Sequence, residues 1–346
     1  MSEPESPVLV IGEALTDILV GQDGRQRACP GGSPANVALG LARLGHPVRL
    51  ATRVGRDEHG RKLQRHLGDS GVVLTDGSVV EAPTSTATAT LDDRGAASYA
   101  FDIVWELPET ATESARTGLI AHLHIGSIAA NLAPGSARVL AAVEAARSRC
   151  TVSYDPNLRP ALLVSPVEER PRVERLVAAS DVVKASEEDL GWLYPGQDLH
   201  EVADRWIRSG PSLVVITRGG DGAEAFWPGG SRHQPPTPVE VVDTVGAGDA
   251  FMSGLISGLL EAGLLGGGSV GPDGPRARAL LRNATGPQDA AGTAGTDPGL
   301  VEALSRAARA AALTCARPGA DPPTRAEFDR ASPVPQLSGV QSEYRS

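Results

Sequence analysis

The segment from Val241 to Phe251 (VVDTVGAGDAF) places two glycines and a carboxylate between an apolar strand and a helix. Gly246 and Gly248 permit backbone conformations that a side chain forbids, and they let a ligand approach the main chain. The free N–H groups and the positive dipole end of the following helix favour an anion such as phosphate. Asp249 lies in the first turn of that helix. It either caps the helix or acts as a base beside a bound phosphate.

A second glycine turn, Pro30 to Asn36 (PGGSPAN), leads into a helix over Val37 to Leu44 that Gly45 ends. Ser33 is the expected N-cap, with Pro34 at the first helical position. Asn36 offers a donor and an acceptor to a sugar hydroxyl, or it caps the helix locally.

Polar residues also follow two predicted strands. The apolar run Val8–Ile11 predicts a strand buried on both faces. Asp17, shortly after it, is placed to bind hydroxyls at the carboxyl end of the sheet, or it lies in a solvated turn. A strand ending at Tyr154 precedes Asp155, Asn157 and Arg159. These three residues form a candidate polar site, unless Arg159 only pairs with Asp155.

Two later strand ends carry further candidates. Ser186 and Asp189 fit the S-x-x-D capping pattern, which is a sufficient structural explanation. The carboxylates from Glu187 to Asp189 are equally able to hold waters around a magnesium ion. The loop Thr217 to Gly222, after a strand over Leu213–Ile216, is able to admit phosphate or ribose.

Two other patterns are weaker. His122 and His124 share one face of a strand, but no third ligand is in view, so packing is favoured over a metal site. The segment from Gly55 to Lys62 approaches a P-loop pattern, but Arg61 and Lys62 stand where Lys and Ser/Thr are required. We interpret it as a turn into a helix.

Composition narrows the classes of partner and compartment. The 346 residues carry a formal net charge of −10 and no basic tract, which argues against nucleic acid and anionic membranes as partners. Cys29, Cys150 and Cys315 form no CxxC pair, so a reduced, cytoplasmic setting is expected. The sequence has no signal-peptide core and no run of ~18 apolar residues that would span a membrane.

Strands that alternate with helices predict an α/β fold with a mostly parallel sheet covered on both faces. The segment from Thr84 to Phe101, with a turn at 92–95, predicts a hairpin that covers a site. Residues 264–298 are rich in Gly, Pro and Ala, and we expect a flexible insertion with a helix over Ala277–Leu281. The tail 333–346 is expected to be disordered.

The two glycine turns lie within longer motifs. Gly31–Asn36, continued through Leu41–Gly45 and Val54–Gly60, resembles the N-terminal signature of the PfkB (ribokinase-like) carbohydrate kinases. Asp243–Asp249 resembles their C-terminal signature. The resemblance spans nearly the whole chain. It implies a ribokinase-like three-layer α/β/α domain over 1–332, with a small β lid from segments within about 12–30 and 84–105.

The resemblance implies transfer of the γ-phosphoryl group of ATP to a sugar hydroxyl, with Mg²⁺ as cofactor. Asp249 would be the base, and the amides of Gly246, Ala247 and Gly248 would form an anion hole. A homodimer through the lid is also expected. The remaining implied roles are sugar binding by Asp17, Gly31, Gly32, Asn36 and Arg159, nucleotide binding by Lys184, Ser186, Thr217, Gly219, Gly222 and Gly248, water-mediated Mg²⁺ binding by Glu188 and Asp189, and K⁺ binding near Asp243 and Val245.

The family's magnesium-linked Asn-x-x-Glu motif here reads Ser186 to Asp189 (SEED), as in fructokinase-type members. The motif at Asp155 to Pro160 (DPNLRP) resembles both fructokinases and 2-keto-3-deoxygluconate kinases. Fructose is favoured because of Gly12–Ala14 (GEA) and Gly31–Asn36 (GGSPAN). Ribokinase or nucleoside kinase activity is a further alternative. A non-catalytic sugar or nucleotide sensor is the alternative from another class. A dinucleotide-dependent oxidoreductase is rejected, because no G-x-G-x-x-G follows the first strand.

Overall fold

A nine-stranded sheet forms the centre of the computed structural model, which describes residues 6–21, 23–91, 97–117, 120–267, 270–271, 274–284 and 297–331. The strand order is β15-β14-β13-β12-β11-β10-β1-β4-β6. The strands from β13 to β6 in this order pair in parallel, and β14 and β15 extend the sheet in the antiparallel direction. The bounds are β1 Val8–Ile11, β4 Val48–Ala51, β6 Val72–Leu74, β10 His122–Gly126, β11 Thr151–Asp155, β12 Val182–Ser186, β13 Leu213–Thr217, β14 Ala223–Trp227 and β15 Gly230–Gln234.

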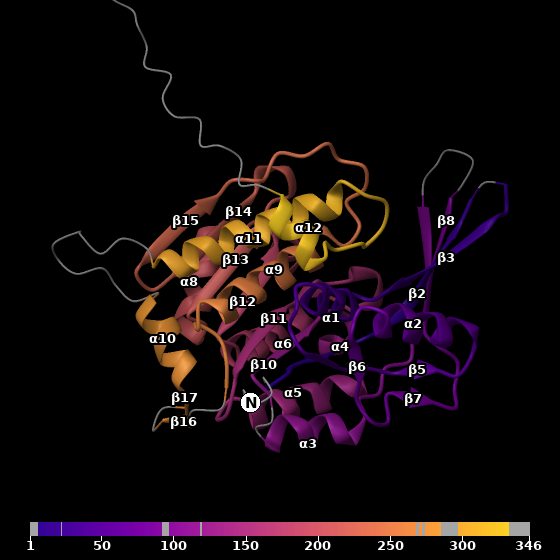
Figure 1. Ribbon diagram of the computed structural model, residues 1–346, viewed down its shortest axis with the longest axis horizontal. Helices are drawn as coiled ribbons and strands as arrows, with labels where there is room; N and C mark the ends of the chain where they lie inside the picture. The colour runs from indigo at the N-terminus through magenta and orange to yellow at the C-terminus, as the bar shows by residue number, and fades with distance from the viewer. Residues whose placement is uncertain are drawn as a thin grey trace, which may run out of the picture.

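Helices cover both faces of this sheet, which confirms the predicted three-layer fold (Figure 1). Successive strand residues point to opposite faces, so Val8 and Val10 pack in one core while Leu9 and Ile11 pack in the other. The first core is covered by α1 Ser33–Arg43, α2 Glu58–Gly68, α9 Ala247–Glu261 and α11 Pro298–Cys315. The second is covered by α3 Glu109–Thr117, α4 Ser127–Asn131, α5 Gly135–Ala146, α6 Pro166–Ala178, α7 Glu187–Leu193 and α8 Leu199–Ser209.

A separate four-stranded sheet, in the order β3-β2-β8-β9, projects from this body at the right of Figure 1. Its strands are β2 Leu15–Val20, β3 Gln26–Gly31, β8 Thr86–Leu91 and β9 Ala97–Asp102. They fall in the two segments predicted for the lid, except that β3 runs one residue further. The predicted hairpin of β8 and β9 is present, and its turn at 92–95 lies outside the described residues.

The structure corrects two local predictions. The segment from Val48 to Gly55 predicts a single strand, but it divides into β4 and the short β5, Val54–Gly55, which pairs with β7, Val79–Val80. Ser33 is not the N-cap of α1. Gly32 occupies that position with φ 101°, and no side chain caps the helix. The Ser33 hydroxyl is therefore available to another partner.

Parts of the predicted insertion 264–298 are packed on the body. The described residues include the strands β16 (Val270–Gly271) and β17 (Gly274–Pro275) and the helix α10 (Arg276–Ala284), which contains the predicted helix. Arg278 of α10 is buried, and it donates to Asp181 and to the carbonyls of Arg147 and Cys150. The flexibility predicted for the rest of the insertion, and the tail 333–346, lie outside the described residues.

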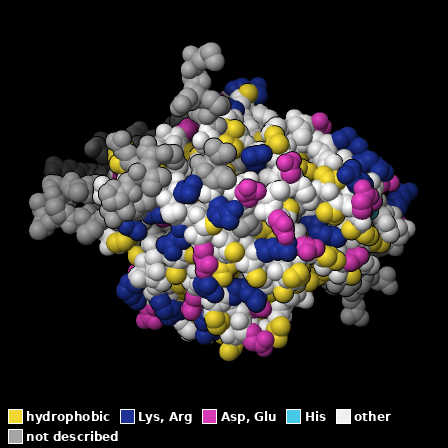
Figure 2. Space-filling view, turned by 90° about the horizontal axis from the view of Figure 1, so that it is seen from below, with side chains coloured by type: hydrophobic (Ala, Val, Ile, Leu, Met, Phe, Trp, Pro, Cys, Tyr) yellow, Lys and Arg dark blue, Asp and Glu magenta, His cyan; other side chains and the backbone are white. Residues whose placement is uncertain are grey.

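Among the described residues, no helix is long and apolar enough to cross a membrane. Acidic and basic side chains are intermixed over the face shown in Figure 2. The remaining short elements are η1 Pro160–Leu162, η2 Gly219–Asp221 and α12 Arg325–Arg330.

Candidate active site

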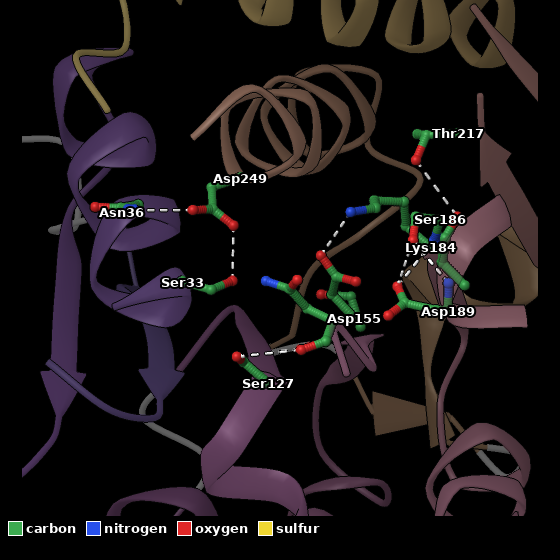
Figure 3. Close-up of polar contacts among 12 residues, drawn as sticks. Ser33, Asn36, Ser127, Asp155, Lys184, Ser186, Asp189, Thr217 and Asp249 are labelled. Carbon is green, nitrogen blue, oxygen red and sulfur yellow. Dashed lines mark hydrogen bonds and ion pairs between the residues drawn. The ribbon is translucent and has the colours of Figure 1, made fainter. Parts of the chain in front are cut away.

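The two glycine turns meet at the carboxylate of Asp249. Ser33 Oγ donates to Asp249 Oδ1 at 2.7 Å, and Asn36 Nδ2 donates to Asp249 Oδ2 at 2.8 Å (Figure 3). The N-cap of α9 is Gly246, and no side chain caps this helix, which excludes the capping interpretation of Asp249. Burial raises the pKa of Asp249, and the hydrogen bonds from Ser33 and Asn36 oppose that rise.

The turn before Asp249 is fixed by close backbone contacts. Gly246 has φ 76°, and a Cβ added to it would lie 2.5 Å from the Cβ of Ala320. Asp243 holds the turn from the other side, because it accepts hydrogen bonds from Val245 N at 3.0 Å and Gly319 N at 2.8 Å. These amide contacts lower the pKa of Asp243. The turn therefore has the defined geometry that an anion hole requires.

A buried ion pair lies beside this turn. Lys184 Nζ donates to Asp155 Oδ2 at 2.8 Å, and both side chains are almost fully buried. A Cβ added to Gly248 would lie 3.2 Å from Lys184 Nζ, so the ammonium group lies close to the start of α9. Burial alone would lower the pKa of Lys184, but neighbouring carboxylates, led by Asp155, raise it. The site therefore holds a positive charge near the glycine turn.

Asp155 also has an oxygen with no partner. Its Oδ1 is buried and accepts no hydrogen bond, while Oδ2 accepts from Lys184. Burial raises the pKa of Asp155 to about 6, and Lys184 opposes the rise. Unsatisfied buried oxygens are uncommon in proteins, and they often mark a place that a ligand or an ion fills.

The predicted sugar-binding residues lie around the base of the lid. Asp17 is on β2, and a Cβ added to Gly31 would lie 1.9 Å from its Oδ2. Asp17 is exposed, yet partial loss of hydration raises its pKa to about 6, and the positive charge of Arg159 lowers it. Gly32 packs against the main chain of Glu13, with 2.5 Å between an added Cβ and the carbonyl oxygen of Glu13.

Arg159 does not pair with Asp155, so that alternative is wrong. Its NH1 group donates to Asn157 Oδ1 at 2.6 Å and to the Asn157 carbonyl at 3.0 Å, whereas Asp155 pairs with Lys184. The charge of Arg159 acts on the carboxyl groups of Asp17 and Asp249. The charge of Arg159 therefore reaches both the predicted sugar-binding carboxyl group and the proposed base.

The capping pattern predicted at the start of α7 is confirmed. Ser186 and Asp189 form a reciprocal capping box. Asp189 Oδ1 also accepts from Leu158 N at 2.7 Å, so both of its oxygens are engaged by the protein. Glu188 is exposed in the same turn. Asp189 of the SEED motif therefore holds the loop between β11 and η1, and Glu188 offers a solvent-exposed carboxylate.

The remaining nucleotide-site candidates lie at neighbouring strand ends. Thr217 ends β13 beside Ser186 of β12, and its hydroxyl donates to the carbonyl of Ala185 at 3.5 Å. Gly219 and Gly222 flank the turn that follows, with φ 51° and 85°. In Figure 3, Ser186, Asp189 and Thr217 lie on the far side of Lys184 from Asp249.

The two histidines are packed, as predicted. His122 and His124 are buried on β10 and are hydrogen-bonded to Thr151 and Ser153. Within the described ranges, no group of three or more His, Cys, Asp or Glu residues is arranged to hold a metal ion.

The sequence prediction missed two participants. Ser33 was expected to cap a helix, and it instead orients the Asp249 carboxylate. Glu13 is buried just below the Gly32 turn, and burial raises its pKa to about 7. The one available signal was its place directly after Gly12, at the carboxyl end of a buried strand.

The model of the pfkB family carbohydrate kinases matches residues 8–327. A fructokinase of Klebsiella pneumoniae is 36% identical over 265 residues, which cover 74% of this chain and 85% of that protein. A fructokinase of Xylella fastidiosa with bound ATP superposes with a TM-score of 0.77 at 25% identity, covering 94% and 97% of the two chains. A double mutant of a fructokinase from Vibrio cholerae O395, bound to fructose, ADP and a potassium ion, gives 0.68 at 28% identity, covering 92% and 95%.

Proposed function

The chain belongs to the pfkB family of carbohydrate kinases, and we propose that it is a fructokinase, which transfers the γ-phosphoryl group of ATP to a hydroxyl of fructose. One observation carries the proposed chemistry. The buried Asp249 carboxylate stands in the first turn of α9 and is held by Ser33 and Asn36 of the sugar-motif turn. Asp249 therefore links the start of α9, which is proposed to bind phosphate, to the turn from Pro30 to Asn36, which is proposed to bind the sugar hydroxyl.

In this proposal Asp249 accepts the proton of the attacking hydroxyl, and the oxygen then bonds to the γ-phosphorus as the bond to ADP breaks. The amides of Gly246, Ala247 and Gly248 donate to the oxygens of the moving phosphoryl group. Lys184, beside Gly248, offsets the negative charge that gathers there. Positioning and charge stabilisation are the main contributions that phosphoryl transfer needs from a protein.

The sugar is proposed to lie between the lid and the body. Asp17 and Asn36 would bind its hydroxyls, and Gly31 and Gly32 would let it approach the main chain. Arg159 supplies the cationic donor on the same side. The relatives that carry the name fructokinase support fructose over the alternative sugars.

The nucleotide is proposed to lie along the ends of β12 and β13, against Ser186, Thr217, Gly219 and Gly222, with its phosphates toward Lys184 and Gly248. Mg²⁺ is the proposed metal, and it would neutralise phosphate charge. The unpartnered Oδ1 of Asp155 is a hard oxygen that suits it. Glu188 and Asp189 would act through waters, and Asp189 the less so because the protein already engages its oxygens.

Three further assignments are part of the proposal. Asp243 and Val245 would lie at a K⁺ site, which the potassium-bound relative supports by analogy. The lid would form a homodimer contact, since Leu19 on its strand β2 is 44% exposed. The free state of Cys29, Cys150 and Cys315 fits a reducing cytoplasm.

A coupled assay of ADP release tests the substrate, using fructose, ribose, 2-keto-3-deoxygluconate and adenosine. We expect the highest kcat/KM with fructose. A higher value with 2-keto-3-deoxygluconate would replace fructose by an acidic sugar, for which Arg159 would be the clamp. Saturable sugar binding without turnover of any of the four would instead support the sensor alternative.

A further inference from the structure

Two residues with strained backbone lie next to each other at the sugar side of the site. Ser127 (φ 57°) and Asn157 (φ 36°) are the non-glycine residues with positive φ in the described part of the chain. They follow β10 and β11, which are neighbouring strands, and Ser127 Oγ donates to the carbonyl of Asn157 at 3.5 Å. Such conformations persist only where the surrounding structure enforces them, and they cluster at functional sites.

Glu13 contacts the segment that contains the first of them, Ser127. Its side chain is buried, and its Oε2 accepts from Ala129 N at 3.0 Å, in the first turn of α4. The Ser127 hydroxyl has a single hydrogen, which it shares between the Glu13 carboxyl group and the Asn157 carbonyl. Glu13 therefore binds both the backbone and the side chain of the segment in which Ser127 is strained.

The second strained residue holds Arg159. The NH1 group of Arg159 donates to Asn157 Oδ1 at 2.6 Å, to the Asn157 carbonyl at 3.0 Å and to the Leu158 carbonyl at 3.0 Å. These contacts bend the guanidinium back over its own loop. The contacts thus run without a gap from Glu13 through Ser127 and Asn157 to Arg159.

Glu13 also contacts the glycine turn from Pro30 to Asn36 through its main chain. An added Cβ on Gly32 would lie 2.5 Å from the Glu13 carbonyl oxygen. The main chain of Glu13 thus supports the turn that carries Ser33 and Asn36, while its side chain supports the Arg159 loop.

We propose that Glu13 is a positioning residue for sugar recognition: through Ser127 and Asn157 it holds the Arg159 guanidinium where the sugar binds. This rests on the proposed sugar kinase activity and on Arg159 as a sugar ligand. A buried carboxylate with no direct cationic partner is costly to keep. A neutral side chain would accept the hydrogen bond from α4 with a smaller desolvation cost. We therefore attribute the presence of Glu13 at this position to the way it orients Ser127, Asn157 and Arg159.

The test compares Glu13→Gln, Arg159→Ala and the double variant, with KM for the sugar, KM for ATP, kcat and the melting temperature as readouts. Glutamine keeps an acceptor for Ala129 N, but its Nε2 group can only donate to the Ser127 hydroxyl, so the hydrogen bonding that orients Ser127 is rearranged. We expect Glu13→Gln to raise KM for the sugar roughly tenfold, the usual weight of a hydrogen bond to a charged group, with KM for ATP nearly unchanged. In the Arg159→Ala background the same change should have little further effect.

Glu169→Gln is the matched control, because Glu169 is a buried carboxylate that pairs with Arg172 on α6 outside the site. It should leave KM for the sugar unchanged. If Glu13→Gln does not fold, Ser127→Gly replaces it, since glycine accepts the φ of 57° and removes the hydroxymethyl side chain that contacts Glu13 and Asn157. That variant is expected to raise KM for the sugar in the same selective way.

The outcomes separate the two hypotheses. A raised KM in Arg159→Ala with an unchanged KM in Glu13→Gln and Ser127→Gly overturns the role of Glu13 and leaves the kinase proposal intact. Fully additive effects in the double variant overturn it too. An unchanged KM in Arg159→Ala removes Arg159 as a sugar ligand, and with it the proposed role of Glu13.

Discussion

Ser33 Oγ donates a 2.7 Å hydrogen bond to Asp249 Oδ1 and so joins the first turns of α1 and α9 across 216 residues of chain. Asn36 donates to the other oxygen of the same carboxylate. Both bonds stabilise the ionised form and oppose the effect of burial, which raises the pKa. The two donors thus align the carboxylate and leave lone pairs free to accept a proton.

Replacing Asp249 by Asn should abolish most of the turnover, because an amide has no basic oxygen for the hydroxyl proton. A loss in kcat of about 10³-fold is expected from the usual range for general bases. KM for the sugar should change far less, since Asn keeps an acceptor for one of the two donors. Steady-state ADP release and sugar binding by calorimetry measure the two effects. Turnover that survives in this variant would remove Asp249 as the base.

Ser33→Ala is the companion variant. It leaves the carboxylate in place but removes one of its two orienting donors. We expect a smaller loss in kcat, roughly tenfold, in line with the weight of a charge-assisted hydrogen bond. A loss as large as that of Asp249→Asn would mean that Ser33 does more than orient the carboxylate.

Gly31→Ala is predicted to weaken sugar binding without unfolding the protein. A Cβ at position 31 would lie 1.9 Å from Asp17 Oδ2, and the exposed Asp17 side chain is free to turn away. The backbone is then spared, but the carboxylate leaves its place, so KM for the sugar should rise by about tenfold or more. Gly68→Ala is the control, because nothing lies within 4 Å of its added Cβ. An unchanged KM in Gly31→Ala would exclude Asp17 from sugar binding.

The sequence was sufficient for the layers of the fold and for the two glycine turns, because buried strands and helix starts are coded by neighbouring residues. Val8–Ile11 and the helix after Gly246 are examples. The hydrogen-bond partners of each turn could not be predicted from the sequence, since they come from segments far apart in the chain. Local capping rules placed Ser33 at a helix end, whereas Asp249, 216 residues away, takes its hydroxyl.

The same limit applies to the charges. The sequence offered Arg159 as the cation near Asp155, and nothing local pointed to Lys184, which is 29 residues away. The parallel register sets Ser153 beside Val182, which brings Asp155 and Lys184 onto one face of the sheet. Glu13 was overlooked for a similar reason, because its partner Ala129 lies 116 residues away. Pairing across strands is decided by packing of the whole sheet.

Glu13 should make the stability of the protein depend on pH. Burial raises its folded-state pKa from 4.5 to about 7, so the folded protein binds more protons than the unfolded chain between these values. The stabilisation of the folded state by this extra proton is fully present below pH 4.5 and is lost as the pH rises through 7. The free energy of unfolding of Glu13→Gln minus that of wild type should therefore be higher at pH 8 than at pH 5, by roughly 2 kcal/mol. Urea unfolding at the two pH values measures this difference, and a difference that does not change with pH would contradict it.

Arg278 should anchor the described part of the insertion through its buried pair with Asp181. Arg278→Met leaves that carboxylate buried and unpaired, and the loss of one partner of a buried ion pair costs about 3–5 kcal/mol. Arg278→Met/Asp181→Asn should recover part of this, because the uncompensated charge is gone. Asp181 precedes β12, at the end of the sheet opposite Lys184 and Asp249, so kcat and both KM values should stay near those of wild type. Equal stability of Arg278→Met and wild type in urea would refute the anchor.

Asp155→Asn tests which carboxylate serves the metal. Asp155 Oδ1 is buried without a partner, whereas the oxygens of Asp189 are already hydrogen-bonded to Ser186 and Leu158. We therefore expect Asp155→Asn to raise the Mg²⁺ concentration needed for half-maximal rate by about tenfold or more. Asp189→Asn should mainly lower the melting temperature, because it weakens a capping box. Titration of the rate with Mg²⁺ at fixed ATP distinguishes them. If instead Asp189→Asn shifts the Mg²⁺ curve and Asp155→Asn does not, the metal depends on the α7 carboxylates, and the unpartnered oxygen of Asp155 has another function.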